Sequence, residues 1–109
     1  MSYVKAVERQ EIPNGAMKAV KLQDKEILVA NVNGTFYAIG SRCPHAKADL
    51  SEGTLEGSIL TCPRHGSRFD VTTGKAISGP KILFIRVGVG DVQSYEVKVK
   101  DDDVLIKMK

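Results

Sequence analysis

Cysteine and histidine are scarce in this chain, with two of each among 109 residues, and tryptophan is absent. The four residues fall into two short motifs, Cys43-Pro44-His45 and Cys62-Pro63-Arg64-His65. With no cysteine or histidine elsewhere, the sequence excludes a second metal site built on thiolate or imidazole ligands. We therefore expect both motifs to serve one metal site.

Long apolar runs are missing as well. No stretch approaches the roughly 20 apolar residues that a membrane-spanning helix needs, and Met1–Arg9 has no apolar segment typical of a signal peptide. We expect a soluble, cytoplasmic protein that does not bind membranes. In a reducing compartment two cysteines are more often metal ligands than a disulfide, and a disulfide would leave both histidines unexplained.

Positive charge is not concentrated in any one segment of the sequence. The formal net charge is +3, and the basic residues form no stripe or arm, so nucleic acid is not an expected partner. Catalysis on a substrate of its own is not expected either, because no second group of acid, base and nucleophile is visible. Both observations leave the single metal site as the candidate function.

Strand patterns dominate the rest of the chain. Residues 95–100 and 104–109 alternate apolar and charged side chains, and Asp101–Asp103 between them predicts the turn of a terminal hairpin. A second hairpin is predicted over residues 26–39, because Asn33-Gly34 accepts the positive φ angles of a tight turn. No stretch of useful length has helical periodicity, so the sequence predicts an all-β sandwich or barrel.

The chain length is that of a single domain, and we expect residues 1–109 to form one unit with both metal-site motifs in a central segment, about residues 40–80. The apolar segment 81–90 is ambiguous. A buried strand broken by a bulge and a loop that packs against a partner explain its composition equally well.

Each of the two motifs combines a cysteine, a proline and a nearby histidine. Proline restricts φ and removes a backbone donor, which makes each loop stiff. Mixed thiolate and imidazole ligands suit a [2Fe–2S] cluster, since neutral imidazoles leave the oxidised cluster less negative than four thiolates would and so raise its reduction potential. Stiff loops suit electron transfer, which is slowed by any rearrangement that accompanies the change in charge.

The motif C-P-H…C-P-R-H-G-S-R-F-D, over residues 41–70, resembles the Rieske family, and the small chain resembles a Rieske-type ferredoxin. By that resemblance Cys43 and Cys62 bind one iron of the cluster, and His45 and His65 bind the other. The resemblance also implies an antiparallel β-sandwich with a small cluster-binding subdomain at one tip.

Other positions refine the resemblance. Ser67 matches the family serine that donates to a bridging sulfide, and Ser78-Gly79-Pro80 is similar to the loop that covers the cluster. High-potential members carry two further cysteines and a tyrosine, where this chain has Ala48, Arg64 and Phe69. Losing the disulfide and the phenol donor implies a potential in the lower half of the family span of roughly −150 to +300 mV.

The resemblance implies a one-electron carrier that receives electrons from a reductase and passes them to an oxygenase or another redox enzyme. Four basic residues near the motifs could form a positive rim that steers an acidic partner. These residues are Arg42, Lys47, Arg64 and Arg68.

Two alternatives remain open at this point. The chain could be the small subunit of a larger reductase, similar to that of some nitrite reductases. The same Cys2His2 set could instead hold a structural zinc ion, although zinc fingers usually group like ligands together ahead of a helix.

Overall fold

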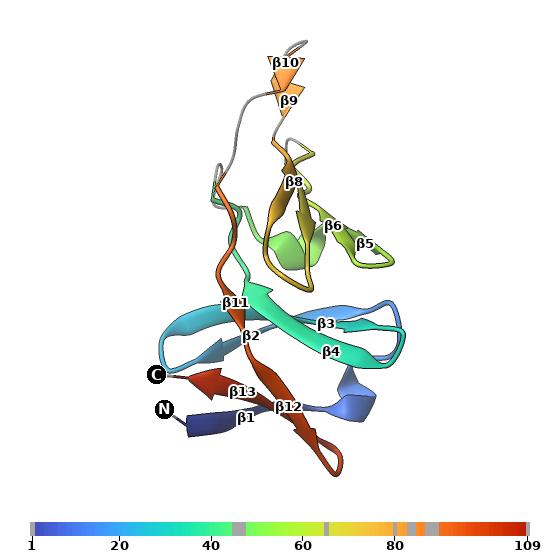
Figure 1. The fold of residues 1–109 in the computed structure, drawn as a ribbon, viewed down its shortest axis with the longest axis vertical. Coiled ribbons are helices and arrows are strands. Elements are labelled where there is room, and N and C mark those ends of the chain that lie inside the picture. Colours follow the sequence, from blue (N-terminus) through green and yellow to red (C-terminus); the bar gives the residue numbers. More distant parts are fainter. Residues whose placement is uncertain are drawn as a thin grey trace.

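The structure is a computed structural model that describes residues 2–44, 48–64, 66–79, 81–82, 85–86 and 90–108. His45, Lys47, His65 and Pro80 lie outside the described residues. Strands make up most of the described chain (Figure 1). The strands are β1 (Ser2–Glu8), β2 (Met17–Leu22), β3 (Lys25–Val32), β4 (Thr35–Gly40), β5 (Thr54–Glu56), β6 (Ile59–Thr61), β7 (Arg68–Asp70), β8 (Ala76–Ser78), β9 (Lys81–Ile82), β10 (Ile85–Arg86), β11 (Ser94–Tyr95), β12 (Val97–Lys100) and β13 (Asp103–Met108).

Helical structure in the described ranges is limited to two single turns of 3₁₀ helix, η1 (Arg9–Glu11) and η2 (Leu50–Glu52). No helix of the described residues is long and apolar enough to cross a bilayer. The all-β prediction is confirmed.

The strands pair antiparallel and stack in three layers along the long axis of the molecule (Figure 1). We call them the base sheet, in the order β1-β13-β12, the middle sheet, β11-β4-β3-β2, and the tip sheet, β5-β6-β7-β8. Strands β9 and β10 form a separate ribbon beyond the tip sheet (Figure 1). Both chain ends lie at the base sheet, away from the tip.

The middle sheet is buried on both faces, and its side-chain alternation divides the core into two groups. Ile27 and Val29 of β3 join Val104 and Ile106 in the group against the base sheet. Leu28 and its neighbours on the other face belong to the group against the tip sheet. Because successive strand residues point to opposite faces, one apolar run serves two cores.

The predicted hairpin over residues 26–39 is confirmed, with β3 paired to β4 around Asn33-Gly34. Both turn residues have positive φ, 55° for Asn33 and 90° for Gly34, as a tight hairpin turn demands. The Asn31 side chain supports the turn, since its Oδ1 accepts the N–H of Gly34 at 2.8 Å.

The terminal hairpin differs from the prediction in its first strand. Tyr95 belongs to β11 and pairs with Ala38 of the middle sheet, whereas β12 begins at Val97 and pairs with β13. The chain therefore changes sheets within a run that alternates regularly. The alternation persists because Tyr95 and Val97 both pack against the same buried group. Asp103 lies in β13, so the turn itself is Asp101-Asp102.

The described residues of the ambiguous segment 81–90 form two short strands rather than one continuous strand. Strands β9 and β10 pair as a short ribbon, with Ile82 opposite Ile85 and Lys81 opposite Arg86. Residues 83–84 and 87–89 lie outside the described residues.

Candidate metal centre

Cys43 and Cys62, 19 positions apart in sequence, are brought into one buried group. Cys43 follows β4 of the middle sheet and Cys62 follows β6 of the tip sheet. Their exposed fractions are 1% and 2%, and they share the core between these sheets with Leu60 and Phe69. Neither cysteine forms a disulfide. The fold thus places the two cysteine sulfur atoms inside one apolar environment.

The two cysteine loops are closed by the same backbone hydrogen bond. The N–H of Cys43 donates to the carbonyl of Ala48 at 3.0 Å, and the N–H of Cys62 donates to the carbonyl of Ser67 at 2.7 Å. Each bond runs from a cysteine to the fifth residue after it and encloses a predicted histidine position. His45 and His65 themselves lie outside the described residues. The repeated bond gives both loops fixed ends, which agrees with the stiffness that the prolines predict.

Ser67 has a buried hydroxyl that lacks a partner among the described residues. Its exposed fraction is 1%, and no hydrogen bond to its Oγ is present in the described part of the chain. Burying a hydroxyl without a partner costs on the order of 1–3 kcal/mol, so native structures rarely leave one unsatisfied. An acceptor such as a sulfide beside the Cys62 loop would satisfy it, and the donor set therefore fits an iron–sulfur cluster.

The three positions at which this chain differs from the pattern of high-potential Rieske proteins differ from one another in burial. Phe69 is fully buried in the same group as both cysteines, while Ala48 packs at the edge of that group. Arg64 is exposed on the second loop. A phenol at position 69 would therefore lie in the same core group as the two cysteines.

Charged groups brace the first loop. The Arg42 guanidinium, adjacent to Cys43, lies 3.0 Å from the Glu26 carboxylate of β3, and Arg42 also forms a β-bridge with Asp49. The hydrogen bond that Arg42 donates to Glu26 raises the pKa of Arg42, and the nearby carboxylates of Asp49 and Glu52 act in the same direction. Arg42 thus stands among acidic groups, so its charge is largely compensated.

Asp49 caps η2, the turn that follows the first loop. Its Oδ1 accepts the Ser51 hydroxyl at 2.6 Å and the Ser51 N–H at 3.0 Å. These bonds, with the hydroxyl contributing most, lower the pKa of Asp49, and the charge of Arg42 adds to the effect. Ion pairing and capping together fix the return of the chain after Ala48.

The predicted positive rim is therefore uneven in the described residues. Arg42 is paired with Glu26, whereas Arg64 and Arg68 are exposed on the side of the second loop. Arg68 donates from Nε to the Ser78 hydroxyl at 3.1 Å, which links the second loop to the end of β8. Lys47 lies outside the described residues.

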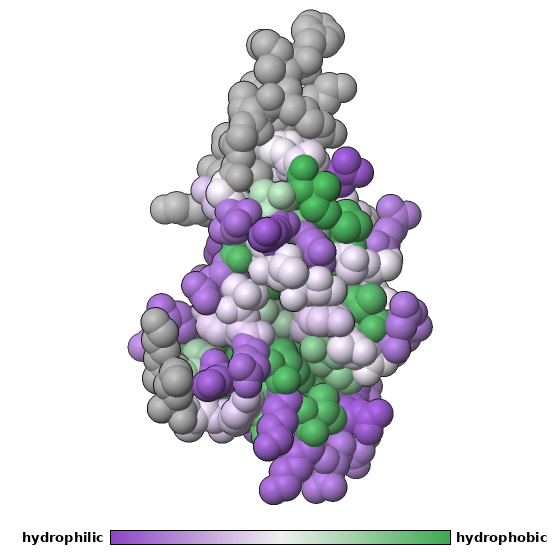
Figure 2. Space-filling view, in the orientation of Figure 1, coloured by the Kyte–Doolittle hydropathy of each residue, from purple (hydrophilic) through white to green (hydrophobic). Residues whose placement is uncertain are grey.

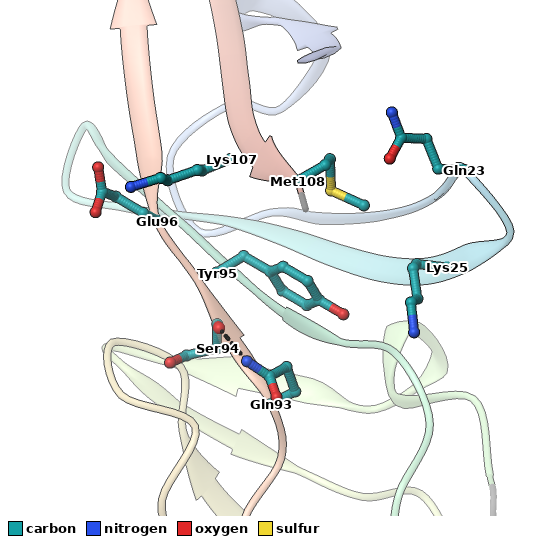
Figure 3. Close-up of a pocket in the computed structure, with 8 residues that line it drawn as sticks. All are labelled: Gln23, Lys25, Gln93, Ser94, Tyr95, Glu96, Lys107 and Met108. Atoms are coloured by element: carbon teal, nitrogen blue, oxygen red, sulfur yellow. Dashed lines mark hydrogen bonds between the residues drawn. The ribbon is translucent and has the colours of Figure 1, made fainter. Parts of the chain in front are cut away.

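A pocket of about 580 Å³ opens at the first loop, where Glu26, Arg42, Cys43 and Pro44 line it. Another pocket, of about 520 Å³, lies at the far side of the middle sheet, between the β2–β3 turn and β11–β13 (Figure 3). In that pocket the Tyr95 ring extends toward Lys25, and burial raises the pKa of its phenol. None of its lining residues is a cysteine or histidine, so it is separate from the candidate metal centre.

Comparison with known families gives a match over nearly the whole chain. The model of the family described as the Rieske [2Fe-2S] domain matches residues 2–104. The ferredoxin component of the naphthalene 1,2-dioxygenase/salicylate 5-hydroxylase systems of Ralstonia sp. is 37% identical over 108 residues, which cover 99% of this chain and 97% of that relative.

Solved structures agree with the sequence comparison. The ferredoxin of carbazole 1,9a-dioxygenase from Nocardioides aromaticivorans IC177 has a TM-score of 0.85 at 28% identity, with 100% of both chains covered. A chain of the complex of reduced oxygenase and oxidized ferredoxin in carbazole 1,9a-dioxygenase has a TM-score of 0.83 at 30% identity, covering 98% of this chain and 97% of that one.

Proposed function

This chain belongs to the Rieske [2Fe–2S] domain family and is an electron carrier rather than an enzyme; from this premise we propose that it passes single electrons from a reductase to an oxygenase that attacks an aromatic compound. The family carries a [2Fe–2S] cluster, so the structural-zinc alternative is wrong. The named relatives are ferredoxin components of dioxygenase systems, which favours a separate carrier over the small subunit of a nitrite-type reductase.

We propose that Cys43 and Cys62 hold one iron of the cluster and that His45 and His65 hold the other. The observation that carries this assignment is that both loops are closed in the same way. In each loop the cysteine N–H donates to the carbonyl oxygen of the fifth residue after it. Each loop then supplies one thiolate and one imidazole, with the histidine two residues after Cys43 in the first loop and three residues after Cys62 in the second. When bound, the cluster supplies a site that accepts and releases one electron at a time.

The surrounding residues have three roles in this proposal. The apolar group that includes Leu60 and Phe69 excludes water from the sulfur side of the site. The loop-closing bonds limit movement when the charge changes. Ser67 donates its hydroxyl to a bridging sulfide, which would satisfy its otherwise unpartnered oxygen and favour the reduced, more negative state.

We further propose that residues 1–109 act as one domain, with the cluster-binding segment at about residues 40–80, and that the protein works in the cytoplasm. The tip sheet and both cysteines fall within that central segment, which supports the first part. The reducing conditions of the cytoplasm suit thiolate ligands, which supports the second.

Spectroscopy of the purified protein tests the assignment. We expect acid-labile sulfide, a brown oxidised form and, after reduction, a low-temperature EPR signal with the low average g value of mixed histidine and cysteine ligation. The variants His45→Ala and His65→Ala should lose this signal, while Arg64→Ala in the same loop should keep it. A histidine variant with an unchanged spectrum, or a protein without labile sulfide, would contradict the proposal.

Reconstitution tests the direction of electron flow. The reductase and oxygenase of the Ralstonia system serve as probes, since its ferredoxin component is 37% identical to this chain. We expect the reductase to reduce the protein and the oxygenase to reoxidise it, with one electron per protein in each step. Reduction and reoxidation only by small chemical agents would limit the proposal to cluster binding.

A further inference from the structure

Strand β8, at the edge of the tip sheet, carries a β-bulge at Ile77. Arg68 pairs with Ser78, and the next residue, Phe69, pairs with Ala76, so Ile77 is the extra residue on β8. Its side chain is 47% exposed, the largest fraction among the exposed large hydrophobic residues of the described chain. Bulges often redirect a side chain beside a functional site. Here the bulge accompanies an isoleucine that faces solvent.

Ile77 lies close to the second cysteine loop. Strand β7 begins at Arg68, directly after Ser67, whose carbonyl closes the Cys62 loop. The 3.1 Å bond from Arg68 to the Ser78 hydroxyl then joins β7 to the residue that follows Ile77. A protein seated on Ile77 would therefore also contact the second loop, where an electron must leave or enter.

Protection of the sheet edge does not explain an exposed isoleucine here. Edge strands are usually protected by charged residues, lysine above all. The base sheet follows that rule, because exposed Val99 of its edge strand β12 stands between Lys98 and Lys100. On β8 the neighbours of Ile77 are Ala76 and Ser78, neither of which is charged. The contrast favours a binding role for Ile77.

The surface around Ile77 is basic on the side of the metal centre. Arg68 is exposed on the neighbouring strand β7, and Arg64 is exposed on the second cysteine loop. The nearby carboxylates lie toward the other end of β8 and accept local hydrogen bonds. Asp91 accepts the N–H of Ala76 at 2.8 Å, and Asp70 accepts the hydroxyl and N–H of Thr72.

Apolar and polar surface adjoin each other on the β8 side of the tip (Figure 2). We propose that Ile77, together with Arg68 of the neighbouring strand and Arg64 of the second cysteine loop, forms the docking surface for a redox partner whose own face carries an apolar recess bordered by carboxylates. The apolar side chain provides the central contact, and the arginines attract and orient the partner. This inference rests on the proposed electron-carrier function and adds the surface through which the carrier is recognised.

The test measures electron transfer from the reduced protein to two acceptor proteins in a stopped-flow instrument. Plastocyanin is the acidic probe and cytochrome c is the basic probe; in each reaction the protein loses one electron, and copper(II) or haem iron(III) gains it. We expect the rate constant with plastocyanin to fall as salt rises, because opposite charges are screened. The rate constant with cytochrome c should not fall.

The variants form matched pairs at two exposed edge-strand residues. Ile77→Ala should lower the rate constant with plastocyanin by about fivefold, as loss of an apolar contact residue worth about 1 kcal/mol predicts. Ile77→Asp should lower it further. Val99→Ala and Val99→Asp, which make the same changes on the base sheet, should leave it within about twofold of the original value.

A second pair of variants, Arg68→Gln and its control Lys98→Gln on the base sheet, tests the role of charge in docking. Only Arg68→Gln should weaken the salt dependence of the rate constant with plastocyanin. Equal effects of the Ile77 and Val99 pairs, or a rate with plastocyanin that rises with salt, would overturn the docking surface. Such results in a protein with a normal EPR signal would leave the proposed function intact, whereas absence of the signal from the unmutated protein would count against that function itself.

Discussion

The carbonyl oxygen of Gly74 accepts the N–H of Val92 at 2.7 Å, and this bond joins the β7–β8 turn to the chain that returns toward β11. Val92 is buried in the group that contains both cysteines. The bond therefore connects the far end of the tip sheet to the core under the metal centre, so the sheet is held at both ends of β8.

Replacement of Gly74 tests this connection. Gly74 has φ of +80°, and a Cβ added there would overlap the carbonyl oxygen of Val92. We expect Gly74→Ala to lower the free energy of unfolding by more than about 2 kcal/mol, since backbone strain and displacement of Val92 add together. Gly57→Ala is the control, with φ of +61° and no atom near the added Cβ. Denaturant midpoints of the two variants that coincide would show that the Val92 contact is unimportant.

Removal of the buried hydroxyl at position 67 should change the reduction potential. Ser67→Ala deletes the donor that we assign to a sulfide, and a donor stabilises the reduced, more negative cluster. We expect the potential to fall by about 60 mV, the equivalent of one hydrogen bond of about 1.4 kcal/mol. Voltammetry measures the shift, with the equally buried Ser41→Ala as control. The same potential in Ser67→Ala and in the original protein would show that this hydroxyl does not reach the cluster.

A phenol introduced at position 69 should have the opposite effect. Phe69 has no exposed surface and belongs to the buried group of Cys43 and Cys62. Phe69→Tyr should raise the potential by tens of millivolts, roughly up to 60 mV, if the new hydroxyl donates to a cysteine sulfur. Phe36→Tyr makes the same change in the other core group and should leave the potential unaltered. A folded Phe69→Tyr protein with an unshifted potential would refute the assignment of position 69.

The cap of η2 predicts a loss of stability in acid. The pKa of Asp49 is lowered below its ordinary value, chiefly by the Ser51 hydroxyl. A carboxylate with a lowered pKa in the folded state stabilises the fold above the pKa of the unfolded chain, and that contribution disappears as the pH falls through the folded value. Asp49→Asn should therefore show a shallower decline in thermal midpoint below about pH 4. Asp24→Asn, in the exposed β2–β3 turn, should decline as the original protein does.

The sequence predicted those features of the fold that depend only on residues close together in the chain. Asn33-Gly34 predicted its hairpin because the turn requirement concerns only the two residues themselves. The alternation at the C-terminal end predicted two strands correctly but assigned Tyr95 to the wrong one, since a side chain that faces the correct core can belong to either sheet. The 3₁₀ turn at Arg9–Glu11 was missed, because three residues are too few to establish a period.

The candidate site was predicted in part. The ligands that we propose, and their spacing, are visible in the sequence, and the role proposed for Ser67 comes from the family pattern. The ion pair between Arg42 and Glu26 was not predicted, because they are sixteen positions apart and only the approach of β3 to the first loop brings them together. The expected contribution of Arg42 to a positive rim is weakened for the same reason.

By itself, the sequence determined the chemistry available to this protein: two thiols and two imidazoles in stiff loops, on a chain patterned for strands. Those properties follow from residue type and short spacing. The tertiary structure decided that both thiols share one dry core, that the Ser67 hydroxyl is buried without a local partner, and that Ile77 faces solvent at a bulge. Each of these depends on how separate strands pair and stack, and pairing between distant segments is set by packing of the whole chain rather than by any one segment.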